Sequence, residues 1–304
     1  MIHGVLNIHK EKGYTSHDVV AKLRGILGQK KIGHTGTLDP DATGVLPICL
    51  GKATKLCDML TDKDKTYEAV LLLGQSTDTQ DTTGTVLQEC PTSELTKEQV
   101  AACIAGFIGE GKQIPPMYSA LKVNGKKLYE LARQGMVVER KARDITIYDI
   151  RILEMNLPRV RMEVSCSKGT YIRTLCHDIG EKLGCGGCME TLVRTKVSRF
   201  ELANSLTLAE VEAKQQGGCL EEVLVPIDAM FSQYEAVVLK KEASAFAYNG
   251  NVFLPKHLQK VPELYDGKYV RVYDDLHRFL AIYAYDEAKK HFYIVKMFYT
   301  NEGV

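Results

Sequence analysis

The clearest helical patterns in the chain follow two threonines that can act as helix caps. In residues 15–28 the apolar positions recur on one helical face, and Thr15 or Ser16 can cap the first turn. The positions on that face are Val19, Val20, Leu23, Ile26 and Leu27. After Thr96, the corresponding face consists of Val100, Ile104 and Phe107. The spacing predicts two amphipathic helices, the first of which ends near Gly28.

A third helical pattern begins after a turn at residues 168–169. Its apolar face comprises Ile172, Leu175, Cys176, Ile179 and Leu183. Gly184 would end this helix. Tyr171 and Arg173 lie in its first turn but off the apolar stripe, so both can face a cleft where a strand leads into the helix.

Alternating or short apolar runs between these segments predict strands. In the first two thirds of the chain they cover residues 68–73, with Tyr67 at the entry, 145–153 and 160–166. Near the end, three β-rich runs cover residues 269–273, 279–285 and 292–299. Pro226 and the segment around residues 233–234 are typical of a linker. We therefore expect domains at 1–232 and 233–304.

The composition is that of an ordinary globular protein, with 45% hydrophobic residues among 304 and a net charge of +1. This near-neutral sum does not exclude RNA binding, because binding depends on the clustering of charge on one face. The first residues lack a basic region followed by an apolar run, and no apolar segment is long enough to span a bilayer. We expect a cytoplasmic protein without a membrane partner.

The nine cysteines show no framework spacing and are expected to be reduced thiols. Cys185 and Cys188 form the one close pair of interest, separated by two glycines. A structural zinc ion would need two further ligands, and the sequence offers no second pair at suitable spacing. We favour a glycine-rich turn and expect neither a metal nor a cofactor.

Basic residues are concentrated in residues 115–143, where they outnumber the acidic ones and are interspersed with Tyr118 and Tyr129. They are Lys122, Lys126, Lys127, Arg133, Arg140, Lys141 and Arg143. One interpretation is a solvated helix, with Leu128 and Leu131 on its packed face and Gly135 as its stop. The other is a basic arm that binds phosphates. The residues alone favour neither interpretation over the other.

Residues 33–47, GHTGTLDPDATGVLP, form a glycine-rich loop that presents Asp39 beside a proline. Glycines allow unusual backbone angles, while Pro40 fixes its own φ and pushes Asp39 out of the α region. Such a loop can aim a carboxylate. An isolated Asp-Pro pair beside glycines would be ordinary turn chemistry.

The whole loop, however, resembles the signature of the bacterial tRNA pseudouridine synthase B family. The resemblance continues, in the family's order, at 51–55 (GKATK), 65–67 (KTY), 115–122 (PPMYSALK), 166–173 (CSKGTYIR) and 192–195 (LVRT). It covers most of the chain to about Phe231. It implies an α+β fold: a catalytic domain around a mixed, mainly antiparallel sheet with flanking helices, and a small β-rich, PUA-like domain that binds RNA. Two departures are Glu11 after Lys10, where proline is common, and the turn at residues 186–188.

The resemblance also implies a reaction and its residues. Asp39 matches the catalytic aspartate, and Arg173 the arginine that pairs with it. Tyr67, Tyr171, Leu192 and His34 match residues that contact a flipped uridine. The activity would be isomerisation of uridine 55 in the TΨC loop of tRNA, without cofactor, metal or an obligate protein partner. Residues 115–143 match the family's RNA-clamping thumb, which favours the basic arm.

Chemistry indicates what Asp39 requires. Burial would raise its pKa and neutralise it unless a cation compensates, and the planar guanidinium of Arg173 suits that task. The flipped base needs a dry pocket with aromatic contacts, for which Tyr67 is the best stacking candidate.

Two other functions stay open. One is a tRNA-binding chaperone without chemistry. The other is a hydrolase that uses Asp39, although a second carboxylate at a recognisable partner position is lacking.

Overall fold

A nine-stranded mixed sheet forms the centre of the larger part of the protein in the computed structural model, which describes residues 1–61, 63–123 and 125–299. The strands along its path are β1 (Gly4–Lys10), β3 (Thr43–Leu50), β12 (Gly187–Val197), β4 (Lys65–Leu73), β11 (Arg159–Cys166), β10 (Arg143–Asn156) and β7 (Gly109–Gln113). Two short strands pair at its side: β2 (Ile32–His34) with β3, and β13 (Phe200–Glu201) with β12. All neighbours are antiparallel except β12 and β3. The predicted α+β fold is confirmed.

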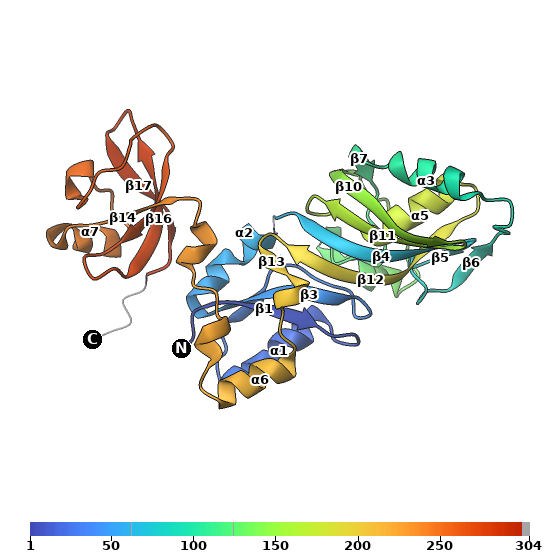
Figure 1. Ribbon diagram of the computed structural model, residues 1–304, viewed down its shortest axis with the longest axis horizontal. Helices are drawn as coiled ribbons and strands as arrows, with labels where there is room; N and C mark the ends of the chain where they lie inside the picture. Colours follow the sequence, from blue (N-terminus) through green and yellow to red (C-terminus); the bar gives the residue numbers. More distant parts are fainter. Residues whose placement is uncertain (62, 124, 300–304) are drawn as a thin grey trace.

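Four helices cover this sheet in two pairs (Figure 1). Helices α1 (Ser16–Leu27) and α6 (Leu208–Gln216) pack together over β1 and β3 around a core that includes Leu6, Leu23 and Ile48. Helices α3 (Lys97–Ala105) and α5 (Ile172–Lys182) pack over β4, β10 and β11. All three predicted helices are present.

Local sequence explains where these helices begin and end. Thr15 caps α1 and Thr96 caps α3, each with a reciprocal side-chain bond three residues on. Gly28 ends α1 in the left-handed conformation, with φ of 62°. Tyr171, expected in the first turn of α5, is instead its N-cap residue.

The strands extend beyond the predicted runs. Strand β4 begins at Lys65, so Tyr67 lies within it and not at its entry. Residues 43–47, which the sequence suggested were part of a loop, belong to β3, and the connection that carries Asp39 is correspondingly short. Strands β1 and β12 were not predicted, since their apolar residues do not alternate.

A separate four-stranded sheet forms the C-terminal module, at the left of Figure 1. Its strands, in order, are β14 (Glu235–Val238), β15 (Tyr269–Tyr273), β16 (Phe279–Asp286) and β17 (His291–Met297), with α7 (Ser244–Tyr248) beside them. The three predicted β-rich runs are confirmed as β15 to β17. The module has its own core, which includes Val237, Phe253 and Phe292.

The segment before this module is more than a linker. It contains the 3-10 helix η4 (Asp228–Phe231), and Phe231 is buried in a core shared with Val45, Leu56 and Phe298. This shared core packs the module against the larger part.

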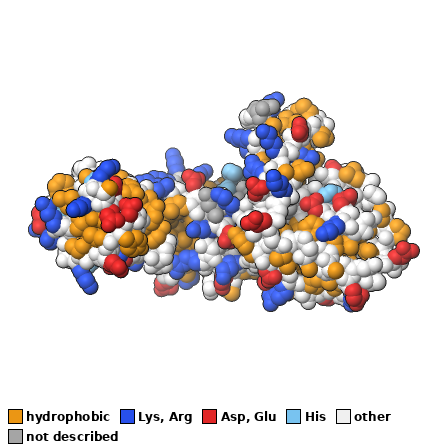
Figure 2. Space-filling view, turned by 90° about the horizontal axis from the view of Figure 1, so that it is seen from above, with side chains coloured by type: hydrophobic (Ala, Val, Ile, Leu, Met, Phe, Trp, Pro, Cys, Tyr) orange, Lys and Arg blue, Asp and Glu red, His pale blue; other side chains and the backbone are white. Residues whose placement is uncertain are grey.

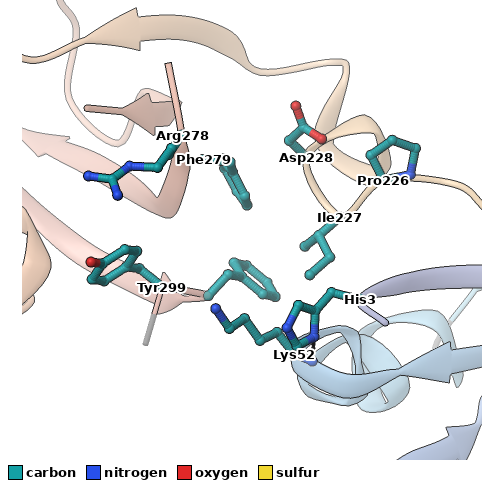
Figure 3. Close-up of a pocket in the computed structure, with 9 residues that line it drawn as sticks. His3, Lys52, Pro226, Ile227, Asp228, Arg278, Phe279 and Tyr299 are labelled. Atoms are coloured by element: carbon teal, nitrogen blue, oxygen red, sulfur yellow. Dashed lines mark hydrogen bonds between the residues drawn. The ribbon is translucent and has the colours of Figure 1, made fainter. Parts of the chain in front are cut away.

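A cavity of about 410 Å³ lies at that junction (Figure 3). His3 and Lys52 face Phe279 and Tyr299 across it. None of the predicted site residues lines it.

The arm, residues 115–143, is an excursion between two paired strands. Gln113 at the end of β7 lies opposite Arg143 at the start of β10, so the chain leaves the sheet and returns to the same place. The arm contains the short elements β8 (Lys122–Val123), β9 (Lys126–Lys127) and α4 (Leu128–Ala132). Leu128 and Leu131 are buried within it. Figure 2 shows Lys and Arg side chains gathered on the protrusion above the body of the molecule.

Candidate active site

Asp39 lies on the short connection between β2 and β3, and its neighbours are held by bonds from the β1–α1 region. The amide of Leu38 donates to Ser16 Oγ at 2.9 Å, and the amide of Gly13 donates to the Pro40 carbonyl at 2.9 Å. Within the connection, the Ala42 amide donates to the Asp39 carbonyl at 3.1 Å. These bonds fix the backbone on both sides of Asp39.

A buried lysine supports the same turn. Lys10 is fully buried, and its ammonium donates to the carbonyls of Tyr14 at 2.6 Å, Pro40 at 3.1 Å and Glu11 at 3.2 Å. Burial lowers the pKa of Lys10 to about 8, although the nearby Asp39 carboxylate opposes this shift. Lys10 therefore contributes both a scaffold for the turn and positive charge near Asp39.

Arg173 is the direct partner of Asp39. Its side chain is 6% exposed, and its Nε lies 3.1 Å from Asp39 Oδ2. Nη1 lies 3.6 Å from Asp81 Oδ2, and it donates to the Thr79 carbonyl at 3.1 Å, while Nη2 donates to the Tyr118 carbonyl at 2.7 Å. The guanidinium is thus held by four groups from three loops, which leaves it a single orientation.

The Asp39 carboxyl group is crowded on one side and open on the other. Burial raises its pKa, the Arg173 guanidinium opposes the increase, and the Asp81 carboxylate adds to it. Its side chain is nevertheless 42% exposed. Asp39 is therefore partly open to solvent, and the dry pocket expected around a flipped base stays a prediction.

Tyr67 and Arg194 are cross-strand neighbours on β4 and β12. Arg194 is 1% exposed, and its Nε donates to the Val45 carbonyl at 2.7 Å. Its guanidinium lies beside the Tyr67 hydroxyl, yet burial raises the pKa of Tyr67 to about 12. The hydroxyl is therefore protonated at neutral pH. Tyr67 is 8% exposed, so most of its ring already packs against protein and little is free for stacking.

A glycine makes the close approach of these strands possible. Gly44 has φ of 108°, and a side chain there would overlap the Arg194 carbonyl oxygen. This backbone contact brings β3 and β12 together beside Asp39.

The other predicted pocket residues surround this centre. His34 Nδ1 accepts from the Gly36 amide at 3.3 Å, and its ring meets His17 edge-on at 5.2 Å. Burial lowers the pKa of His34, which keeps the imidazole neutral at pH 7. Tyr171 is half-buried at the N-cap of α5, and burial raises the pKa of its hydroxyl. Leu192 is half-buried against the core under β4.

Asp81 is one of three site residues that the sequence did not predict. It lies in the loop after β5 (Gln75–Thr77), and its side chain is 14% exposed against Arg173. The only sequence signal was two aspartates among the polar residues 78–83, a composition that turns also have. The roles of Lys10 and Arg194 in the site were missed as well, since a charged residue in a strand is usually exposed.

The basic residues of the arm fall into two groups. Exposed side chains are those of Lys122, Lys126, Arg133, Lys141 and Arg143. Arg140 and Lys127 are half-buried and bonded within the arm: Arg140 donates to the Pro115 carbonyl at 3.1 Å and Lys127 to the Tyr129 hydroxyl at 3.1 Å. Arg140 thus ties the two ends of the arm together in addition to adding charge.

Cys185 and Cys188 flank a turn in which Gly186 has φ of 73°, and both are buried. Within residues 1–61, 63–123 and 125–299, no three His, Cys, Asp or Glu side chains are grouped to hold a metal ion. No helix in the same ranges is long and apolar enough to cross a membrane.

The chain is similar to known proteins over most of its length. Residues 24–172 match the TruB family pseudouridylate synthase N-terminal domain, and residues 173–232 match the tRNA pseudouridylate synthase B C-terminal domain. The tRNA pseudouridine synthase B of Lachnoclostridium phytofermentans is 55% identical over 98% of this chain and 100% of its own length. That of Clostridium tetani is 44% identical over 97% and 99%.

The fold has solved relatives too. The chain superposes on one chain of a Cbf5-Nop10-Gar1 complex with a TM-score of 0.73 and 26% identity, covering 99% of this chain and 86% of that one. Fold and matched domains together define a pseudouridine synthase. More narrowly, the chain belongs to the tRNA pseudouridine synthase B (TruB) family. It is an isomerase that makes pseudouridine in tRNA.

Proposed function

We propose that the protein isomerises uridine 55 in the TΨC loop of tRNA, with Asp39 as the nucleophile. The observation that carries this proposal is the contact between Arg173 Nε and Asp39 Oδ2, 3.1 Å long and almost closed to solvent on the arginine side. A charge-assisted bond of this kind favours the carboxylate form that the reaction needs.

The open side of Asp39 is where the flipped base would lie. A base there would remove water from the exposed side of the Asp39 carboxyl group. Water exclusion strengthens the attraction between Asp39 and Arg173, since the effective dielectric constant falls. The dry pocket would then be completed by the substrate and not by the protein alone.

Tyr67 acts in this proposal through its hydroxyl more than through its ring. A group with a pKa of about 12 is a weak acid at neutral pH, and its neighbour Arg194 would stabilise the phenolate if it formed. We expect Tyr67 to help move a ribose proton. Tyr171, Leu192 and the neutral His34 would contact the base and its sugar.

The arm and the C-terminal module would bind RNA away from the chemistry. The exposed lysines and arginines of residues 115–143 would pair with phosphates of the T arm. The β-rich module would act as a PUA-like RNA-binding domain, and the protein would work in the cytoplasm without an obligate protein partner.

The test is tritium release from a tRNA transcript that carries C5-labelled uridine. We expect release of one label per tRNA molecule, because pseudouridine formation replaces the C5 proton with a bond to ribose. A matched transcript with cytidine at position 55 should release none. Equal release from both transcripts would overturn the assigned position, and a chaperone without chemistry would release no label from either.

Tyr67→Phe tests the second part of the proposal. We expect a rate about 10²-fold lower with tRNA affinity within about twofold, the range of a lost general acid or base. Unchanged kinetics would reduce Tyr67 to a packing residue. Denaturant unfolding of the same variant separates a catalytic loss from a folding defect.

A further inference from the structure

Gln113, the last residue of β7, makes two bonds to one residue of another element. It is 4% exposed. Its side-chain amide donates to the Tyr171 carbonyl at 3.0 Å, and its side-chain oxygen accepts from the Tyr171 amide at 2.8 Å. The Tyr171 amide is thereby satisfied by a buried side chain, and the Tyr171 carbonyl, which accepts from the Leu175 amide at 3.0 Å, receives a second bond.

The residue that it holds is the N-cap of α5, two positions before Arg173. Tyr171 itself offers no side-chain cap to α5. The start of this helix is therefore fixed from outside, by β7. A shift of the first turn would carry the Arg173 guanidinium away from Asp39, since side chains in a helix follow their backbone.

The arm follows Gln113 in the sequence, and one of its first residues, Tyr118, contacts Arg173. The Tyr118 carbonyl accepts from Arg173 Nη2 at 2.7 Å. The N-terminal root of the arm thus contacts α5 twice, through the Gln113 side chain at Tyr171 and through the Tyr118 backbone at Arg173. The segment that would bind RNA is joined to the group that orients the nucleophile.

We propose that Gln113 is a positioning residue for the reaction, which holds the first turn of α5 so that Arg173 meets Asp39. The inference rests on the proposed role of Asp39. Both hydrogen bonds of the Gln113 side chain go to the Tyr171 backbone, and neither goes to that carboxylate. The effect of Gln113 on Asp39 passes through Arg173, while Tyr171, which Gln113 holds by the backbone, would keep its own contact with the base.

The first test is Gln113→Met, which keeps the length of the side chain and removes both bonds. We expect kcat to fall about tenfold or more, because small misplacements of a reacting group are costly, with the Kd for tRNA within about twofold. Gln134→Met is the matched control, since Gln134 is an exposed glutamine near the other end of the arm. A wild-type kcat for Gln113→Met, or a loss that lies in Kd alone, would overturn the proposal.

A double-variant cycle tests the route through the arginine. If Gln113 acts through Arg173, adding Gln113→Met to Arg173→Lys should lower kcat no further than Arg173→Lys alone. Multiplicative losses would show that Gln113 acts elsewhere. Gln113→Glu serves if the methionine variant does not fold: it retains the acceptor for the Tyr171 amide but faces the Tyr171 carbonyl with a second oxygen, and the same loss of kcat is expected.

The result is distinguishable from failure of the proposed function. If Asp39→Asn is inactive while Gln113→Met turns over normally, only this inference fails. If Asp39→Asn retains its activity, the nucleophile is wrong, whatever Gln113 does.

Discussion

The Asp39 site and the arm both concentrate cations, but they hold them in opposite ways. In the site, Lys10, Arg173 and Arg194 are buried, and each donates to backbone carbonyls. In the arm, Lys126 and Arg133 are exposed. Arg133 lies over the Tyr129 ring at 5.4 Å, and neither of these two cations forms an ion pair in the described part of the chain.

The buried cations of the site orient neighbouring groups, whereas the exposed cations of the arm would attract phosphates. Burying a cation is costly unless hydrogen bonds replace its hydration. A buried cation is therefore held in one position by the groups to which it donates. An exposed lysine costs little and remains free to follow a phosphate. The site is therefore sensitive to single changes, while the arm should respond to the sum of its charges.

The largest expected effect is that of Asp39→Asn. Loss of the nucleophile should lower kcat by about 10⁴-fold or more, as in other enzymes that lose theirs. The substitution keeps shape and leaves the arm intact, so the Kd for tRNA should stay within about twofold. Single-turnover tritium release and filter binding measure the two quantities. If Asp39→Asn bound tRNA weakly and kept some activity, the assignment of catalysis to the site and of binding to the arm would be wrong.

Arg194→Ala and Arg133→Ala compare a buried arginine with an exposed one. Removing Arg194 leaves a cavity and an unpaired Val45 carbonyl, and should destabilise the protein by about 3 kcal/mol or more. Arg133→Ala should change the free energy of unfolding by less than about 1 kcal/mol. Urea unfolding followed by circular dichroism measures both. Similar losses of stability for the two variants would contradict the conclusion that buried Arg194 supports the fold more than exposed Arg133 does.

The contrast also explains what could be predicted from the sequence. Helices α1 and α3 follow from apolar spacing and from Thr15 and Thr96, since caps and faces are local properties. Strand β12 escaped prediction because neither its apolar residues nor its buried positions alternate regularly. Its pairing with β4 is decided by chain segments far apart in sequence.

The site was predictable only in part for the same reason. Asp39, Tyr67 and Arg173 were assigned from a resemblance of motifs, and the structure brings Arg173 to Asp39. No periodicity could have shown that Asp81 shares that arginine, or that Gln113 holds Tyr171. Such contacts depend on how loops meet, which is a tertiary property. The solvent exposure of the Asp39 side chain likewise depends on tertiary packing.

A triple change in the arm tests the summed charge. Lys126, Lys127 and Arg133 all replaced by Gln should weaken tRNA binding and reduce the slope of log Kd against log salt by about 0.9 for each phosphate that the arm no longer neutralises. The matched control replaces Lys22, Lys97 and Lys182, three exposed lysines outside the arm and the C-terminal module. We expect kcat at saturating tRNA to be nearly unchanged in both. An equal salt slope for the two variants would make the arm an ordinary solvated surface.

The smallest expected effect is a shift in pH dependence on removing the Asp81 charge. Burial raises the pKa of Asp39, and the Asp81 carboxylate raises it further, so activity should fall on the acid side at a higher pH than for an ordinary aspartate. Asp81→Asn removes one source of the increase and retains the shape of the side chain. The pKa of Asp39 should decrease, and the acid limb of kcat/KM should move to lower pH.

The shift should be modest, since the Arg173 guanidinium lies between the two carboxylates and screens them from each other. Asp144→Asn, which alters a carboxylate that is 91% exposed beside the arm, should leave the acid limb in place. Movement of the limb to higher pH in Asp81→Asn would mean that Asp81 acts mainly by holding Arg173. Asp81 would then belong with Gln113 among the residues that orient the arginine, and not with the charges that set the ionisation of Asp39.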